Sequence, residues 1–161
     1  MKISAKEEYG LRLLIRIAKI QNEEEGLSIN QLSEAEGLSV SYAAKITRIL
    51  RMEGFIQSTR GPKGGYVLAK APEEIHIQEL LRAMDGPLFD ATFCNSHTGQ
   101  QRMCTNSVDC STRSLWRIMQ SALDRVLEQI TLQHLLGDEY NSDNRLQEIL
   151  DKQILKTEEM N

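Results

Sequence analysis

Apolar residues near the start of the chain recur at three- and four-residue steps, which is the spacing of an amphipathic helix. The series follows Ser4 and Glu7, whose separation is that of a capping box. This pattern predicts a helix from about Ala5 to about Gln21. Its apolar positions are Tyr9, Leu11, Leu14, Ile15 and Ala18.

The next two predicted helices are separated by one glycine-containing turn. A capping box that begins at Ser28 predicts a short helix to about Glu36, and Gly37 then turns the chain. Ser39 caps a further helix, which Gly54 closes. A helix, a tight turn and a second helix fit a helix-turn-helix, although many helical pairs share this spacing. The apolar face of the second helix comprises Val40, Ala43, Ile46 and Leu50.

Two β-rich segments, residues 55–59 and 65–69, come directly after this helix pair. The segment 60–64 joins them and contains glycine, proline and two cations, Arg60 and Lys63. It predicts a hairpin whose protruding tip meets phosphates or the narrow minor groove, the alternative being a solvated charged turn. Because a helix-turn-helix followed by a basic hairpin is more specific than either part, the pattern predicts a winged helix.

The second half of the chain is predicted to be helical around one polar loop. A short amphipathic helix ends at residues 85–87, and an unbroken helix is expected from about Ser111 to Leu136. A 26-residue helix is longer than a small domain needs, so we expect a dimerisation helix rather than a single buried packing helix. Residues from Gly137 onward suggest a last amphipathic helix without a readable role. The apolar seam of the dimerisation helix is Trp116, Met119, Leu123, Val126 and Ile130.

The expected fold class is therefore mainly α-helical with a small β-hairpin wing, a winged helix-turn-helix joined to a long dimerisation helix. Residues 1–70 form the expected DNA-binding domain, and residues 71–136 contain the cysteine loop and the dimerisation helix. Residues 137–161 form a C-terminal extension.

Charge is distributed unevenly along this organisation. The 161 residues carry a net charge of −4, but residues 1–70 have eleven Lys and Arg against eight acids, while the remainder has eight against fifteen. Counterion release from DNA rewards a local basic patch rather than a basic average. The polar face of the helix after Ser39 is the expected major-groove surface, and a dimer would address half-sites about 34–36 Å apart. That face carries Ser41, Ala44, Lys45 and Arg48.

All three cysteines, Cys94, Cys104 and Cys110, lie within seventeen residues of one polar loop. An odd number of clustered cysteines is not the pattern of a disulfide framework. Thiolates on one flexible segment can converge on zinc or on the iron of an iron–sulfur cluster. Three unrelated free thiols are the alternative.

Taken together, these segments resemble the IscR/NsrR family of bacterial winged-helix repressors, up to about residue 136. The resemblance implies a homodimeric transcription regulator whose iron–sulfur cluster alters DNA binding. By position, it assigns the major-groove contacts to Ser41, Ala44 and Lys45 and the minor-groove contact to Arg60. The matching segments are residues 1–4, 9–12, 38–42, 58–69 and 85–87, followed by the three-cysteine loop and Trp116.

The chain departs from that family at the fourth ligand of the cluster. Members that sense cluster supply space their cysteines by five and five and place a His three residues after the third; here the first gap is nine and Arg113 stands at that place. Relatives that sense nitric oxide or redox state use a carboxylate from the partner subunit, which corresponds to Glu8. His97 in the loop is the rival ligand. Three thiolates and a carboxylate fit a 4Fe-4S or a 2Fe-2S cluster equally well.

Other functional classes find less support in the sequence. There is no Ser/His/Asp layout, no P-loop and no dinucleotide-binding glycine motif, so we do not expect an enzyme or a small-molecule substrate. No segment approaches the ~20 apolar residues of a membrane span, and the first residues lack a signal peptide's apolar run, so a cytoplasmic protein is expected. The alternative function is a winged-helix regulator whose cysteines bind zinc or act as a thiol switch.

Overall fold

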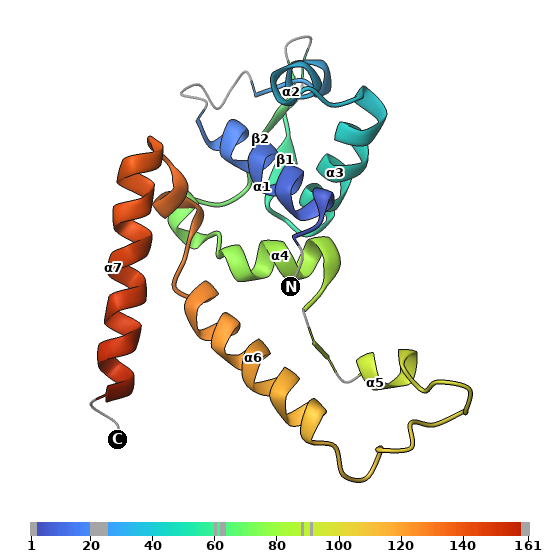
Figure 1. Cartoon of the computed structure of the whole chain (residues 1–161). Coiled ribbons are helices and arrows are strands. Elements are labelled where there is room, and N and C mark those ends of the chain that lie inside the picture. The colour runs from blue at the N-terminus through green and yellow to red at the C-terminus, as the bar shows by residue number, and fades with distance from the viewer. Residues whose placement is uncertain are drawn as a thin grey trace.

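The computed structural model describes residues 3–19, 26–59, 61, 64–87, 89–90 and 92–158. The chain forms a compact layer of helices with a small hairpin, from which two long helices and the cysteine segment extend (Figure 1). In chain order the elements are α1 Ala5–Ala18, α2 Ile29–Glu36, α3 Val40–Met52, β1 Ile56–Ser58, β2 Tyr66–Leu68, the 3-10 turn η1 Pro72–Glu74, α4 Ile77–Asp85, α5 Phe93–Ser96, α6 Ser111–Leu127, the 3-10 turn η2 Leu132–Leu135, and α7 Glu139–Glu158.

Local capping signals start the first helices where the sequence predicts. Ser4 Oγ accepts from the Glu7 amide at 3.1 Å, and a Glu7 carboxylate oxygen accepts from the Ser4 amide at 2.8 Å. The capping box at Ser28 is formed in the same way. Gly37 ends α2 in the left-handed region at φ 64°, a conformation that costs a residue with a Cβ about 1–2 kcal/mol. The helix-turn-helix is therefore confirmed.

The hydrophobic core joins the helix-turn-helix to segments far along the chain. Leu13 of α1, Leu50 of α3, Leu80 of α4 and Leu132 of η2 are all fully buried in one cluster. Helix α4 lies beneath α1 and α3 (Figure 1). The approach of α1 to α4 is close, because a Cβ at Gly10 would lie 2.9 Å from the sulfur of Met84.

The hairpin is antiparallel and completes the winged-helix arrangement. Its register pairs Ile56 with Leu68 and Ser58 with Tyr66. Leu27 adds a bridge on the other edge, since its carbonyl accepts from the Tyr66 amide at 2.8 Å. The fold class predicted from the sequence is confirmed, whereas Arg60 and Lys63 at the tip lie outside the described residues.

The prediction of one helix from Ser111 to Leu136 is wrong, because α6 ends at Leu127. The chain turns there, and the following backbone groups bond to the strand-like segment before α4 instead of continuing a helix. The Ile77 amide donates to the Ile130 carbonyl at 2.9 Å, and the Leu132 amide donates to the Ile75 carbonyl at 2.8 Å. Burial of Leu132 in the core favours this turn over further helix. The last predicted helix is present as α7.

Among the residues that the structure describes, none of the helices combines the length and the apolar content needed to cross a membrane.

Candidate metal centre and nucleic-acid interface

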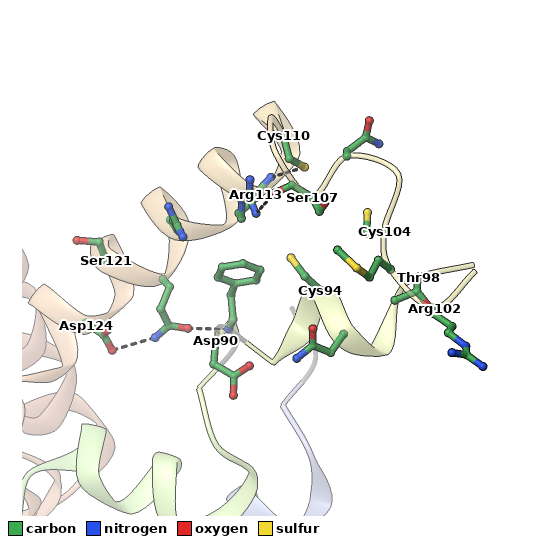
Figure 2. A pocket seen from close by; sticks show the side chains of 16 residues that line it. Asp90, Cys94, Thr98, Arg102, Cys104, Ser107, Cys110, Arg113, Ser121 and Asp124 are labelled. Atoms are coloured by element: carbon green, nitrogen blue, oxygen red, sulfur yellow. Dashed lines mark hydrogen bonds between the residues drawn. The ribbon is translucent and has the colours of Figure 1, made fainter. Parts of the chain in front are cut away.

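The three cysteines line one cavity of about 680 Å³ between α5, the loop after it and the first turns of α6. Cys94 lies on α5, Cys104 lies in the loop and Cys110 is the N-cap of α6. Figure 2 shows the three sulfur atoms around this cavity. All three thiols are free and partly buried. Residues that the sequence places ten and six positions apart are therefore brought to one site.

Arg113 holds the end of the loop against α6. Its amide donates to Cys110 Sγ at 3.3 Å, and its guanidinium donates to the Ser107 carbonyl at 3.0 Å. The sequence resemblance marked this position because a ligating His is expected there. In the structure, Arg113 instead fixes the backbone next to the Cys110 thiol.

The other end of the cavity is built on Asp90. Its Oδ1 accepts from the Thr92 amide at 2.8 Å and from the Phe93 amide at 3.0 Å, which starts the turn leading into α5. The hydroxyl and amide of Thr92 and the amide of Phe93 hold the pKa of Asp90 below its ordinary value. Phe93 in turn stacks on His97 with ring centroids 4.1 Å apart.

The two candidate fourth ligands differ in position. His97 is exposed and its Nδ1 lies 2.8 Å from the Phe93 carbonyl, so the ring is held by its own turn and does not line the thiol cavity. Glu8 is exposed on α1 and borders a second cavity of about 420 Å³ between α1, α4 and α6. Within one chain, neither side chain joins the cysteines.

The donor chemistry of the cavity fits a soft metal or an iron–sulfur cluster, because three free thiols face one space. The thiols have not converged, since within the described ranges no three His, Cys, Asp or Glu side chains are grouped closely enough to hold a metal ion. The loop would have to close further around such a group.

Asp124 on α6 lies between the two cavities. Burial raises its pKa, but hydrogen bonds from Gln78 and Gln120 and the charge of Arg82 outweigh burial, so the pKa lies below its ordinary value of 3.8. The carboxylate is therefore ionised near neutral pH and forms part of the wall shared by both cavities.

The predicted DNA-contacting residues of α3 share its solvent face. Ser41, Ala44, Lys45 and Arg48 are all exposed, opposite the buried face that includes Ile46. Ser41 Oγ lies 3.2 Å from the Ser39 hydroxyl, which itself caps the helix, so the Ser41 side chain is oriented. Lys45 and Arg48 form no ion pair with any described residue.

Helix α6 has no buried residue along its seventeen positions, although it is rich in apolar side chains. Of the predicted seam, Met119 is 37% exposed, whereas Leu123 is half-buried beside α4. Leu115 and Ile118, at 54% and 70% exposure, extend the exposed apolar face and were missed by the sequence prediction. The signal that could have identified them is their own three- and four-residue spacing with Met119 and Ala122.

Comparison with known proteins gives these sites a context. The family model described as Rrf2, iron-dependent transcriptional regulator, matches residues 3–138. The chain is 32% identical over 153 residues to the transcriptional regulator IscR of Aliivibrio salmonicida, covering 95% of this chain and 84% of that protein. The solved structures that share the fold include two regulators. CymR, the global cysteine regulator of B. subtilis, has a TM-score of 0.66 at 30% identity and covers 84% of this chain and 95% of its own. IscR of T. potens has a TM-score of 0.63 at 28% identity, with coverage of 83% and 84%.

Proposed function

The chain belongs to the Rrf2 family of transcriptional regulators, and from this premise we propose that it is a homodimeric DNA-binding repressor whose iron–sulfur cluster controls operator binding. The observation that carries the proposal is that all three cysteines line a single cavity. Its relatives are transcriptional regulators rather than enzymes, in agreement with the sequence analysis.

Cys94, Cys104 and Cys110 are the proposed protein ligands of the cluster. The fourth ligand is proposed to be Glu8 of the partner subunit, because Glu8 is exposed and lies outside the thiol cavity of its own chain. When bound, the cluster supplies a centre that oxidants or nitric oxide can modify. A carboxylate holds iron less tightly than a thiolate does, so this ligand set favours a labile cluster.

The exposed face of α3 is proposed to enter the major groove. Its two cations, Lys45 and Arg48, form no ion pair with the residues that the structure describes and can contact phosphates or base edges. The oriented Ser41 hydroxyl can donate or accept at a base edge. Arg60 and Lys63 of the hairpin tip are proposed to contact the minor groove and the phosphates, which remains a prediction from the sequence. Two such modules in a dimer would address two half-sites.

The exposed apolar face of α6 is proposed to form the dimer interface. Leu115, Ile118 and Met119 present apolar surface that a stable soluble protein normally covers. Val126 of the predicted seam shares this face, seven residues after Met119, whereas Trp116 lies seven residues before Leu123, toward the side of α6 next to α4. Replacing Ile118 with Lys is expected to convert a dimer into a monomer in sedimentation experiments, whereas the matched change Leu155→Lys at the far end of α7 should leave the mass unchanged.

The cluster is tested by counting iron and sulfide per chain after anaerobic purification, together with the visible spectrum. Equal amounts of iron and sulfide are expected, and their number distinguishes a 4Fe-4S from a 2Fe-2S cluster. Serine at any one cysteine should lower the iron content, and Glu8→Ala should shorten the lifetime of the cluster in air. His97→Ala is the matched control and should change neither. A colourless wild-type protein without iron after reconstitution would refute this part of the proposal.

The DNA-binding face is tested with a duplex that the wild-type protein selects from a random pool. Lys45→Ala or Arg48→Ala should weaken binding and reduce the slope of log affinity against log salt by about one unit, as expected for one lost phosphate contact. Lys152→Ala, an exposed cation on α7, is the control. Unchanged affinity and slope in both α3 variants would exclude this face.

A second candidate function is a regulator that uses the cysteines as a thiol switch or for zinc. One observation favours the thiol switch: the three thiols are free, and among the described residues they are not grouped closely enough to hold a metal ion. Metal analysis separates the candidates, since zinc, or no metal together with DNA affinity that changes on mild oxidation, would support this second function.

A further inference from the structure

Two side chains of α6, Gln120 and Asp124, form a common wall of both cavities described above. They border the thiol cavity on one side and the cavity between α1, α4 and α6 on the other. They lie one helical turn apart, so both point to the same side of α6. A change in the cysteine loop on this side of α6 can therefore act on these two residues.

Gln120 is bonded to the base of the cysteine loop. Its side-chain oxygen accepts from the backbone amide of Phe89 at 2.9 Å. Its side-chain nitrogen donates to Asp124 Oδ1 at 2.9 Å, the bond drawn at the labelled Asp124 in Figure 2. Phe89 is buried at 8% exposure and precedes the first cysteine by five residues. A movement of this segment changes one hydrogen bond of Gln120 directly.

Asp124 links Gln120 to α4. Its Oδ1 also accepts from the Gln78 side chain at 2.7 Å, and its Oδ2 lies 3.0 Å from an Arg82 guanidinium nitrogen. Gln78 is 7% exposed, so its amide has few alternative partners if the carboxylate moves. Bonds to an ionised acceptor are stronger than neutral ones, which makes Asp124 a firm junction between α6 and α4.

Helix α4 is in turn fixed to the DNA-binding helices. Leu80 and Met84 belong to the core cluster that includes Leu13 of α1 and Leu50 of α3. A salt bridge joins Asp85 at the end of α4 to the first turn of α1. Because protein interiors are close-packed, a displacement of α4 is transmitted to these helices rather than absorbed.

We propose that Gln120 and Asp124 are positioning residues that couple the state of the cysteine loop to α4 and, through the shared core, to the recognition helix α3. The connection runs from the Phe89 amide through Gln120 and Asp124 to Gln78 and Arg82. The inference rests on the proposed function for one point, namely that gain or loss of the cluster is the event that changes the loop. The connection from the loop to α4 does not depend on that function.

The test compares Gln120→Met with a matched control. Met has a similar length but neither donates nor accepts at the positions of the amide group, so it removes both bonds of Gln120. The control is Gln147→Met on α7, where Gln147 donates to Asp151 at 3.0 Å with the same four-residue spacing. Both residues of this second pair are exposed, and among the described residues neither forms a hydrogen bond with α4 or with the loop.

The first readout is the ratio of DNA affinities in two states of the loop. Affinity for the selected duplex is measured before and after reconstitution with iron and sulfide, and again before and after alkylation of the cysteines with iodoacetamide. We expect Gln120→Met to lower the wild-type ratio about tenfold and Gln147→Met to keep it. A loss of stability alone would lower both affinities together and leave the ratio unchanged.

The second readout is hydrogen exchange of the α4 amides on alkylation, which needs neither iron nor DNA. We expect wild type and Gln147→Met to show altered exchange in residues 77–85 and Gln120→Met to show none. Two results would each overturn the inference. One is an equal ratio of DNA affinities in wild type and Gln120→Met, and the other is wild-type hydrogen exchange in α4 that alkylation does not alter. The proposed cluster can fail independently of this inference. In that case the wild-type protein would contain no iron, but hydrogen exchange in α4 would still change on alkylation.

Discussion

A buried carboxylate, that of Glu36, joins the first two helices of the DNA-binding domain. Replacing its arginine partners should lower the free energy of unfolding by an amount that the structure allows us to work out. Glu36, the last residue of α2, has a side chain only 4% exposed. Its two oxygens accept from Arg12 Nε at 2.7 Å and from Arg16 Nε at 2.9 Å, both on α1. Because α2 packs on α3, this junction also supports the helix proposed to read DNA.

The magnitude follows from the different exposure of the partners. Both arginine side chains are almost half exposed, so each single pair is screened by solvent and contributes about 1 kcal/mol. Arg12 also lies over the Tyr9 ring, 5.2 Å from its centroid, which adds about 0.5 kcal/mol. Losing both arginines is different, since it leaves a buried charge without a cation and costs about 3–5 kcal/mol.

We therefore expect Arg12→Met to lower the free energy of unfolding slightly more than Arg16→Met, and the double variant to lower it by clearly more than the sum. Urea unfolding monitored by circular dichroism measures all three. Arg51→Met on α3 is the control, because that exposed arginine has no ion pair within the described part of the chain, and its effect should stay below about 0.5 kcal/mol. Additive single and double effects would refute the account of Glu36 as a buried charge that needs at least one partner.

Three further outcomes are expected from other parts of the structure. Hydrogen bonds from Lys6 and Ser4 hold the pKa of Asp85 below its ordinary value of 3.8. The stability that Asp85 contributes should therefore be complete above about pH 5 and be lost as the pH falls through its folded-state pKa. Urea unfolding midpoints measured from neutral to acidic pH should fall less steeply for Asp85→Asn than for the wild type. Gly65→Ala should lower the thermal unfolding midpoint more than Gly37→Ala does. The new Cβ at position 65 would lie 2.5 Å from the Leu27 carbonyl carbon, whereas position 37 has open space and only the φ cost of about 1–2 kcal/mol. Arg113→Met should accelerate alkylation of the Cys110 thiol, measured by mass spectrometry, since the clamp on Ser107 is lost; an unchanged rate would show that the clamp does not order this end of the loop.

Features determined by neighbouring residues were predictable from the sequence. The capping boxes at Ser4 and Ser28 and the turn at Gly37 involve partners within three or four positions, and all three are found in the structure. Boundaries were less accurate, since α1 ends at Ala18 rather than near Gln21, and each strand has three residues rather than five. Helix ends depend on small energy differences that single-residue patterns do not resolve.

Features determined by distant residues were not predictable in the same way. In the sequence, Glu36 is an ordinary polar residue at the end of a helix. Only the fold brings it to arginines twenty and twenty-four residues away. The end of α6 is similar, because the turn after Leu127 is stabilised by backbone bonds to residues near α4. Apolar periodicity continued through this turn to Ile130 and so indicated a longer helix than the tertiary contacts allow.

The wide apolar surface of α6 shows why the candidate site was only partly predictable. Periodicity marks every apolar position on a helix, but it does not say which neighbour covers each one. The structure divides this surface: Leu123 and Leu127 face the cavity beside α4, while Leu115 and Ile118 face solvent. Since Cys110 is the N-cap of α6, a second copy packed on the solvent-facing half would also approach the thiol cavity, which neither Glu8 nor His97 lines within its own chain. The exposed apolar face of α6 and the position of Glu8 outside the thiol cavity thus have one common explanation in the proposed homodimer.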